Sequence, residues 1–143
     1  MKKVVIIPTY NEIENISRMI DTVMSLEGEF DMLVIDDGSP DGTAEVVRKR
    51  QAEFGGRLNM IERQGKLGLG TAYIAGFRWA LERDYDYVFE MDCDFSHNPD
   101  DLLRMPATLE EGEADVVVGS RYVKGVNVVD WPMRRLLLSY CAS

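Results

Sequence analysis

The chain has 143 residues, 45% of them hydrophobic and 29% charged; this fits one globular domain and excludes both a disordered chain and a membrane-spanning run. Residues 1–120 carry 12 Lys and Arg against 24 Asp and Glu, whereas residues 121–143 carry four against one. The acidic body argues against nucleic acid as a partner, and the basic end predicts an anion there, either a phosphate or a membrane surface.

Short apolar runs alternate with helical patterns along the chain. The first run stops at Pro8 after four apolar residues, which is too short for a signal peptide and suits a buried strand. Continuous Val and Ile runs are typical of parallel strands covered on both faces. The predicted strands are residues 3–8, 31–36, 58–62, 86–90 and 115–119.

Between the runs, apolar residues recur at helical spacing. The first helix is expected to begin at an Asn11 cap, the second to end at residues 55–56, and the fourth to begin at an Asn98 cap followed by Pro99. The third helix begins near Gly70. Its predicted apolar side consists of Tyr73, Phe77, Ala80 and Leu81.

This alternation predicts an α/β fold, with right-handed crossovers and a mostly parallel central sheet flanked by helices. In such sheets ligands bind at the carboxyl ends of the strands. Polar and ionisable side chains gather directly after the predicted strands, at 9–12, 36–39, 92–94 and 120–122. The sequence therefore predicts a binding site at that edge of the sheet.

The strongest single motif is Asp92-Cys93-Asp94, directly after an apolar strand. Two carboxylates in this spacing can share one divalent cation, and Mg²⁺ or Mn²⁺ prefers carboxylate and phosphate oxygens. Such a cation neutralises a diphosphate leaving group. The alternative is a solvated acidic turn, and the position at a strand end favours the metal site.

Two further segments carry groups that suit a nucleoside. Asp36 and Asp37 can accept hydrogen bonds from a base N–H or a ribose hydroxyl, and the alternative is a tight turn with helix capping. Tyr10 offers a ring for base stacking and Glu12 an acceptor, in a segment that could also be a simple strand-to-helix connection. Lys66, in a glycine-rich loop, is a candidate phosphate contact.

Together these signals resemble the family 2 glycosyltransferases of the GT-A fold, a Rossmann-like nucleotide-diphospho-sugar transferase fold. Within that family the closer resemblance is to the dolichol-phosphate and polyprenol-phosphate mannosyltransferases. The matching stretches span nearly the whole chain: IIPTYNE (6–12), VIDDGSPDGT (34–43), KLGLGTAYIAGF (66–77), MDCDFSHNP (91–99), VVGSRYVKG (117–125) and DWPMRRLLLS (130–139).

The resemblance implies a role for each matching position. The implied nucleotide-sugar site consists of Pro8, Tyr10, Glu12, Ile35, Asp37, Asp92, Cys93 and Asp94. Asp92, Asp94 and Ser96 are the implied metal ligands, although some relatives carry a Gln at the position of Ser96. The implied contacts of the acceptor phosphate are Arg121, Arg135 and Ser139, and the implied catalytic residues are Asp92, Asp94 and Arg121.

The implied activity is metal-dependent transfer of mannose, with inversion, from GDP-mannose to a dolichyl or polyprenyl phosphate. A lipid phosphate is already an anion near neutral pH, so this transfer needs no strong general base. Residues 1–143 are expected to form a single catalytic domain that is truncated at its C-terminus. The two cysteines suggest reduced thiols in the cytoplasm, and the C-terminal part is expected to contact the cytoplasmic face of a membrane.

Three other functions remain open from the residues. The chain could use another nucleotide sugar and acceptor, or bind a nucleotide without catalysis. A nucleotidyltransferase shares the metal and nucleotide, but no Gly- and Lys-rich triphosphate loop follows the first strand. The lone His97 is expected to bond locally, and Gly68-Leu69-Gly70 lacks the spacing of a dinucleotide fingerprint.

Overall fold

A computed structural model of the chain describes residues 1–111. Residues Met1–Pro106 form one compact unit, which contains the four strands that the structure describes. The predicted strand at 115–119 lies outside the described residues. Within the described part, no helix is both long and apolar enough to cross a bilayer.

The elements in chain order are β1 (Lys3–Thr9), α1 (Ile16–Met24), β2 (Phe30–Asp36), α2 (Thr43–Arg50), a 3₁₀ helix (Gln51–Phe54), β3 (Leu58–Glu62), α3 (Leu69–Leu81), β4 (Tyr87–Glu90), a second 3₁₀ helix (Pro99–Leu103) and α4 (Met105–Glu111).

The four described strands form one parallel sheet in the order β3-β2-β1-β4. The pairing of β1 with β2 runs from Lys3 opposite Phe30 to Thr9 opposite Asp36. Because all these strands point the same way, their carboxyl ends meet at one edge. The predicted α/β class with a mostly parallel sheet is confirmed, and the first four predicted strands agree with the observed ones to within one residue at each end.

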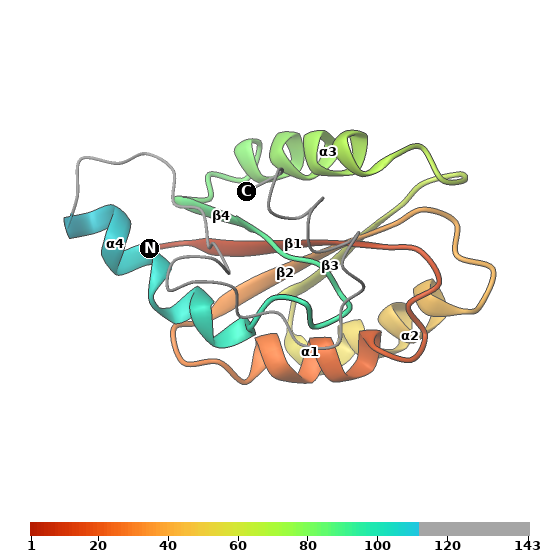
Figure 1. The fold of residues 1–143 in the computed structure, drawn as a ribbon, viewed down its shortest axis with the longest axis horizontal. Helices are drawn as coiled ribbons and strands as arrows, with labels where there is room; N and C mark the ends of the chain where they lie inside the picture. Colours follow the sequence, from red (N-terminus) through yellow and green to blue (C-terminus); the bar gives the residue numbers. More distant parts are fainter. Residues whose placement is uncertain (112–143) are drawn as a thin grey trace, which may run out of the picture. The chain divides into compact units, whose positions relative to one another are not determined.

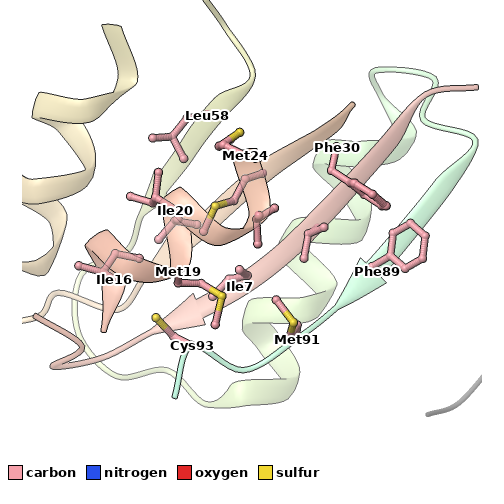
Figure 2. Close-up of a cluster of buried hydrophobic side chains, with 14 of the residues drawn as sticks. Ile7, Ile16, Met19, Ile20, Met24, Phe30, Leu58, Phe89, Met91 and Cys93 are labelled. Atoms are coloured by element: carbon pink, nitrogen blue, oxygen red, sulfur yellow. The ribbon is translucent and has the colours of Figure 1, made fainter. Parts of the chain in front are cut away.

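Helices cover both faces of the sheet, as the continuous apolar runs predict. In Figure 1, α1 and α2 lie on one face and α3 on the other. Side chains alternate along β1, so that Val5 and Ile7 join the core on the α1 side while Val4 and Ile6 join the core on the α3 side. Figure 2 shows the α1-side core, where Phe30 and Phe89 meet edge to face. Two buried faces fix the register of the strands, because a one-residue slip would exchange them.

The predicted start of the first helix at Asn11 is wrong, since α1 begins at Ile16. Asn11 has a left-handed backbone with φ 54°, and its N–H donates to the Ser39 hydroxyl at 2.9 Å. The next two N–H groups are also capped from residues distant in sequence: those of Glu12 and Ile13 donate to the side chains of Thr43 and Asp41. These bonds join the segment after β1 to the segment after β2, and residues 10–13 are held as a loop.

The predicted apolar side of α3 is only partly correct. Ala80 is buried and Tyr73 half-buried, but Phe77 is 38% exposed and Leu81 74% exposed. The buried stripe consists of the small residues Ala72, Gly76 and Ala80, spaced by four. Small side chains let the helix approach the sheet closely: a Cβ atom on Gly76 would lie 2.7 Å from Cδ1 of Ile6.

This close approach predicts opposite outcomes for two helical glycines of α3. Gly76→Val is expected to lower the free energy of unfolding by about 2 kcal/mol or more, because the new side chain overlaps Ile6 and Ile35. A Cβ atom on Gly70 would meet no atom of another element within 4 Å, so Gly70→Val is expected to stay within about 0.5 kcal/mol. Urea denaturation of both variants checks this, and equal stabilities would refute the packing described for α3.

Candidate functional site

A shallow cavity of about 200 Å³ opens at the carboxyl edge of the sheet. It is lined by the end of β1, by residues that follow β1, β2 and β4, and by the loop before α3 with the start of that helix. The lining consists of Pro8, Thr9, Tyr10, Glu12, Asp37, Lys66, Gly68, Leu69, Ala72, Asp92, Cys93 and Asp94. Apart from Ile35, every residue predicted for the nucleotide-sugar site belongs to this lining.

Two other predicted residues, Ile35 and Ser96, are not part of the cavity lining. The side chain of Ile35 is fully buried in the core between the sheet and α3. Ser96 is not part of the lining, and its backbone N–H donates to Asp94 Oδ1 at 3.0 Å. Arg121, Arg135 and Ser139 lie outside the described residues.

A larger cavity, of about 350 Å³, lies at the opposite, amino edge of the strands. Its lining contains none of the predicted site residues and consists of Met1, Lys2, Lys3, Glu29, Asp31 and Arg57. In parallel α/β sheets ligands bind at the carboxyl edge. The smaller cavity is therefore the candidate site, because the acidic motifs converge on it.

The two adjacent aspartates after β2 have different surroundings. Asp36 is 1% exposed and accepts hydrogen bonds from the Thr9 hydroxyl at 2.8 Å and from the Ser39 N–H and hydroxyl at 3.0 and 2.7 Å. Asp37 lines the cavity. Asp36 therefore builds the turn, as the alternative interpretation of this segment expects, whereas Asp37 faces the cavity.

Arg63 contacts Asp37 and was not foreseen from the sequence. Its Nε and Nη2 atoms donate to the two carboxylate oxygens of Asp37 at 2.6 and 2.8 Å. The strand register places the two residues near each other: Glu62 pairs with Asp36 at the end of the ladder, and Arg63 and Asp37 are the residues that follow. The Arg63 N–H donates to the Asp36 carbonyl at 2.8 Å. Finding it required the alignment of β2 with β3, which the motifs alone do not provide.

The motif at 92–94 directs its side chains to different sides. Cys93 is 2% exposed and points into the core beside α1, as Figure 2 shows. Asp92 approaches Tyr73 of α3. Burial, the charges of Asp92 and Glu90, and a hydrogen bond to Asp92 raise the pKa of the Tyr73 phenol. The Tyr73 phenol therefore lies beside the Asp92 carboxylate.

His97 makes the local contact that the sequence predicts. The backbone N–H of Asp92 donates to His97 Nδ1 over a long distance of 3.5 Å. Asn98 caps the turn that follows, since its side chain accepts the N–H of Asp100, with Pro99 at the first position. The helix that begins there is a 3₁₀ helix, and α4 follows it.

The cavity lining suits a divalent cation shared with a ligand. Asp92 and Asp94 offer hard carboxylate oxygens, and Mg²⁺ is usually held by one or two carboxylates together with substrate phosphates. Among residues 1–111, no three acidic, His or Cys side chains converge to hold an ion by themselves. The residues therefore fit a cation whose coordination a phosphate completes.

The charges around the cavity also favour a cation. Its lining carries the carboxylates of Glu12, Asp37, Asp92 and Asp94 and the ammonium of Lys66. Arg63 compensates Asp37, which leaves an excess of negative charge facing any diphosphate. Lys66 Nζ lies 4.9 Å from the centre of the Tyr10 ring, so the lysine and the aromatic platform are neighbours in the cavity.

Burial should make Cys93 inert to thiol reagents. Burial, followed by the charges of Glu12, Asp94 and Asp92, raises the pKa of the Cys93 thiol to about 12, so little thiolate exists at pH 8. In a Cys141→Ser variant, alkylation by iodoacetamide at pH 8 is expected to be at least about a hundredfold slower for the folded chain than in urea. Rates within about tenfold of each other would show that Cys93 is accessible.

Two curated relatives match nearly the whole chain. A polyprenol monophosphomannose synthase of Mycolicibacterium smegmatis is 44% identical over 142 residues, covering 99% of this chain and 53% of that protein. An undecaprenyl-phosphate mannosyltransferase of Micrococcus luteus is 46% identical over 143 residues, covering 100% of this chain and 58% of that protein. The chain thus spans about half the length of these curated relatives.

The fold has a counterpart among solved structures. The crystal structure of S. aureus TarS matches with a TM-score of 0.68 and 26% identity, over 93% of this chain and 23% of that one. This likeness confirms the GT-A fold predicted from the sequence. The family model described as glycosyl transferase family 2 matches residues 4–141, and the chain therefore belongs to glycosyl transferase family 2.

Proposed function

We propose that the chain is the catalytic domain of an inverting transferase that moves mannose from GDP-mannose to a dolichyl or polyprenyl phosphate, with the help of Mg²⁺ or Mn²⁺. One observation carries this proposal: Asp37, on the nucleoside side, and the pair Asp92 and Asp94, on the diphosphate side, line the same cavity. The names of the two relatives, both of which specify mannose and a polyprenyl-type phosphate, support the sugar and the acceptor.

The cavity lining divides into two groups of roles. Tyr10, Glu12 and Asp37 would receive the nucleoside, the ring by stacking and the carboxylates by accepting hydrogen bonds. Asp92 and Asp94 would hold the cation, which when bound neutralises the diphosphate leaving group. Tyr73 lies beside Asp92, and Lys66, next to the Tyr10 ring, adds a positive charge to the cavity.

The acceptor side of the proposal rests on residues beyond the described part of the chain. Arg121, Arg135 and Ser139 would bind the lipid phosphate, and the basic segment 121–143 would bring the domain to the cytoplasmic face of a membrane. Since the lipid phosphate is an anion, it can attack the anomeric carbon without a strong base. Residues 1–143 would belong to one catalytic domain.

Binding and turnover together test this function. Isothermal titration with GDP, UDP and their sugars, with and without Mn²⁺, is expected to show Mn²⁺-dependent binding of the guanosine compounds. Incubation with GDP-mannose and a short-chain polyprenyl phosphate is expected to form the mannosyl lipid. Binding of UDP but not GDP would refute the donor, and GDP binding without product from this chain would support a binding-only domain.

A further inference from the structure

Arg63 joins three segments that meet at the nucleotide cavity. Nε and Nη2 hold both oxygens of Asp37 after β2. Nη1 donates to the Thr71 hydroxyl at 2.9 Å in the first turn of α3, and Nη2 also donates to the Gly68 carbonyl at 3.2 Å. The ion pair is largely shielded from solvent, because the side chains of Arg63 and Asp37 are 11% and 10% exposed. A bidentate pair in such surroundings fixes both partners.

The loop that Arg63 holds forms one wall of the cavity. Lys66, Gly68 and Leu69 all contribute to the lining, whereas Arg63 does not. Gly68 has φ 105°, and its carbonyl also accepts the Thr71 hydroxyl at 2.8 Å and the Ala72 N–H at 3.2 Å. The position of this carbonyl therefore depends on the guanidinium and on the first turn of α3.

The loop is also anchored at its other end. A Cβ atom added to Gly38 would lie 2.9 Å from the backbone N of Gly65, so the turn after β2 and the turn after β3 are packed backbone to backbone. This contact and the bond from Arg63 to the Gly68 carbonyl hold the short segment 65–68 at its two ends. Asp37 and Lys66, which both line the cavity, are thus placed by one shared structure.

We propose that Arg63 is a positioning residue of the nucleotide pocket: it holds the Asp37 carboxylate and the 65–68 loop in the arrangement that receives the nucleoside diphosphate. This inference rests on the proposed function for the identity of the ligand. Asp37 would contact the nucleoside, and the two bonds from the guanidinium fix the orientation of its carboxylate. Arg63 acts through Asp37 and the loop, without touching the substrate.

The test compares variants that remove all or part of the Arg63 contacts. Arg63→Met removes every donor while keeping the length of the side chain, and Arg63→Lys keeps the charge without the fork. Thr71→Val removes the hydroxyl that accepts from Arg63 and donates to the Leu67 and Gly68 carbonyls. GDP affinity with Mn²⁺ is expected to fall about tenfold in Arg63→Met and to recover only in part in Arg63→Lys. Amide hydrogen exchange of residues 64–70, without nucleotide, is expected to accelerate in Arg63→Met and Thr71→Val.

Arg48 provides a matched control. It also bonds two carboxylates, that of Glu45 on α2 and that of Glu62 at the end of β3. Its side chain is 46% exposed, however, and it does not line the cavity. Arg48→Met is expected to leave both readouts unchanged. Unchanged exchange at residues 64–70 in Arg63→Met, or full recovery of GDP affinity in Arg63→Lys, would overturn the proposal. If the wild-type chain binds no GDP, the proposed function fails, and the exchange data alone decide whether Arg63 positions the loop.

Discussion

Asp94→Asn is expected to abolish Mn²⁺-dependent GDP binding while leaving the fold intact. Asp94 is exposed at the cavity, and removal of its charge takes away a proposed metal ligand. Its Oδ1 accepts the Ser96 N–H, and an asparagine oxygen can accept the same bond, so the turn after β4 should survive. The affinity for GDP in the presence of Mn²⁺ should fall at least about a hundredfold.

Two comparisons make this result specific. Asp100→Asn removes an exposed carboxylate from the 3₁₀ helix that follows, away from the cavity, and should bind GDP like the wild type. The melting temperature of Asp94→Asn should match that of the wild type. If Asp94→Asn keeps its Mn²⁺ dependence and its affinity, the assignment of the metal to this motif is wrong.

Asp36→Ala is expected to cost stability, in contrast to the effect at Asp94. The substitution leaves the Thr9 hydroxyl and the Ser39 N–H and hydroxyl without their acceptor at a fully buried position. Each buried donor left without a partner is costly, so the free energy of unfolding should fall by about 3 kcal/mol. Urea denaturation measures this directly.

A surface carboxylate provides the comparison for Asp36. Glu45 bonds Arg48 on the exposed side of α2 and is 55% exposed, so Glu45→Ala should cost less than about 1 kcal/mol. A loss at Asp36 no greater than the loss at Glu45 would mean that the hydrogen bonds of the turn after β2 do not contribute to folding. The loop that carries Asp37 would then need another explanation.

The strands β1 and β2 were predictable because their apolar runs have no polar alternation, as is typical of parallel strands covered on both faces. The start of α1 could not be predicted in the same way. The backbone N–H groups of residues 11–13 donate to side chains about 28 residues further along the chain, those of Ser39, Asp41 and Thr43, instead of to a local cap. Tertiary hydrogen bonds of this kind leave no local pattern. The buried side of α3 was misjudged for a related reason, since close packing selected glycine and alanine over the larger apolar residues.

The candidate site was predictable to the extent that its residues carry functional groups directly after strands. Tyr10, Glu12, Asp37 and the motif at 92–94 satisfy that condition, and the cavity brings them together. Arg63 also follows a strand directly, but its role depends on its contact with Asp37 of the neighbouring strand end. Tyr73 lies within α3, beside Asp92. Their roles depend on which strand pairs with which and on how α3 lies over the sheet, and neither can be read from a short motif.

Paramagnetic broadening by Mn²⁺ in the presence of GDP tests the central claim most directly, because it reports where on the ¹⁵N-labelled chain the ion binds. We expect the amide signals of residues 92–96 and of Asp37 to disappear first, while those of residues 29–31 and 57, at the amino edge of the sheet, remain. Loss of the amino-edge signals first, or no broadening near residues 92–96, would contradict a cation site at the carboxyl edge.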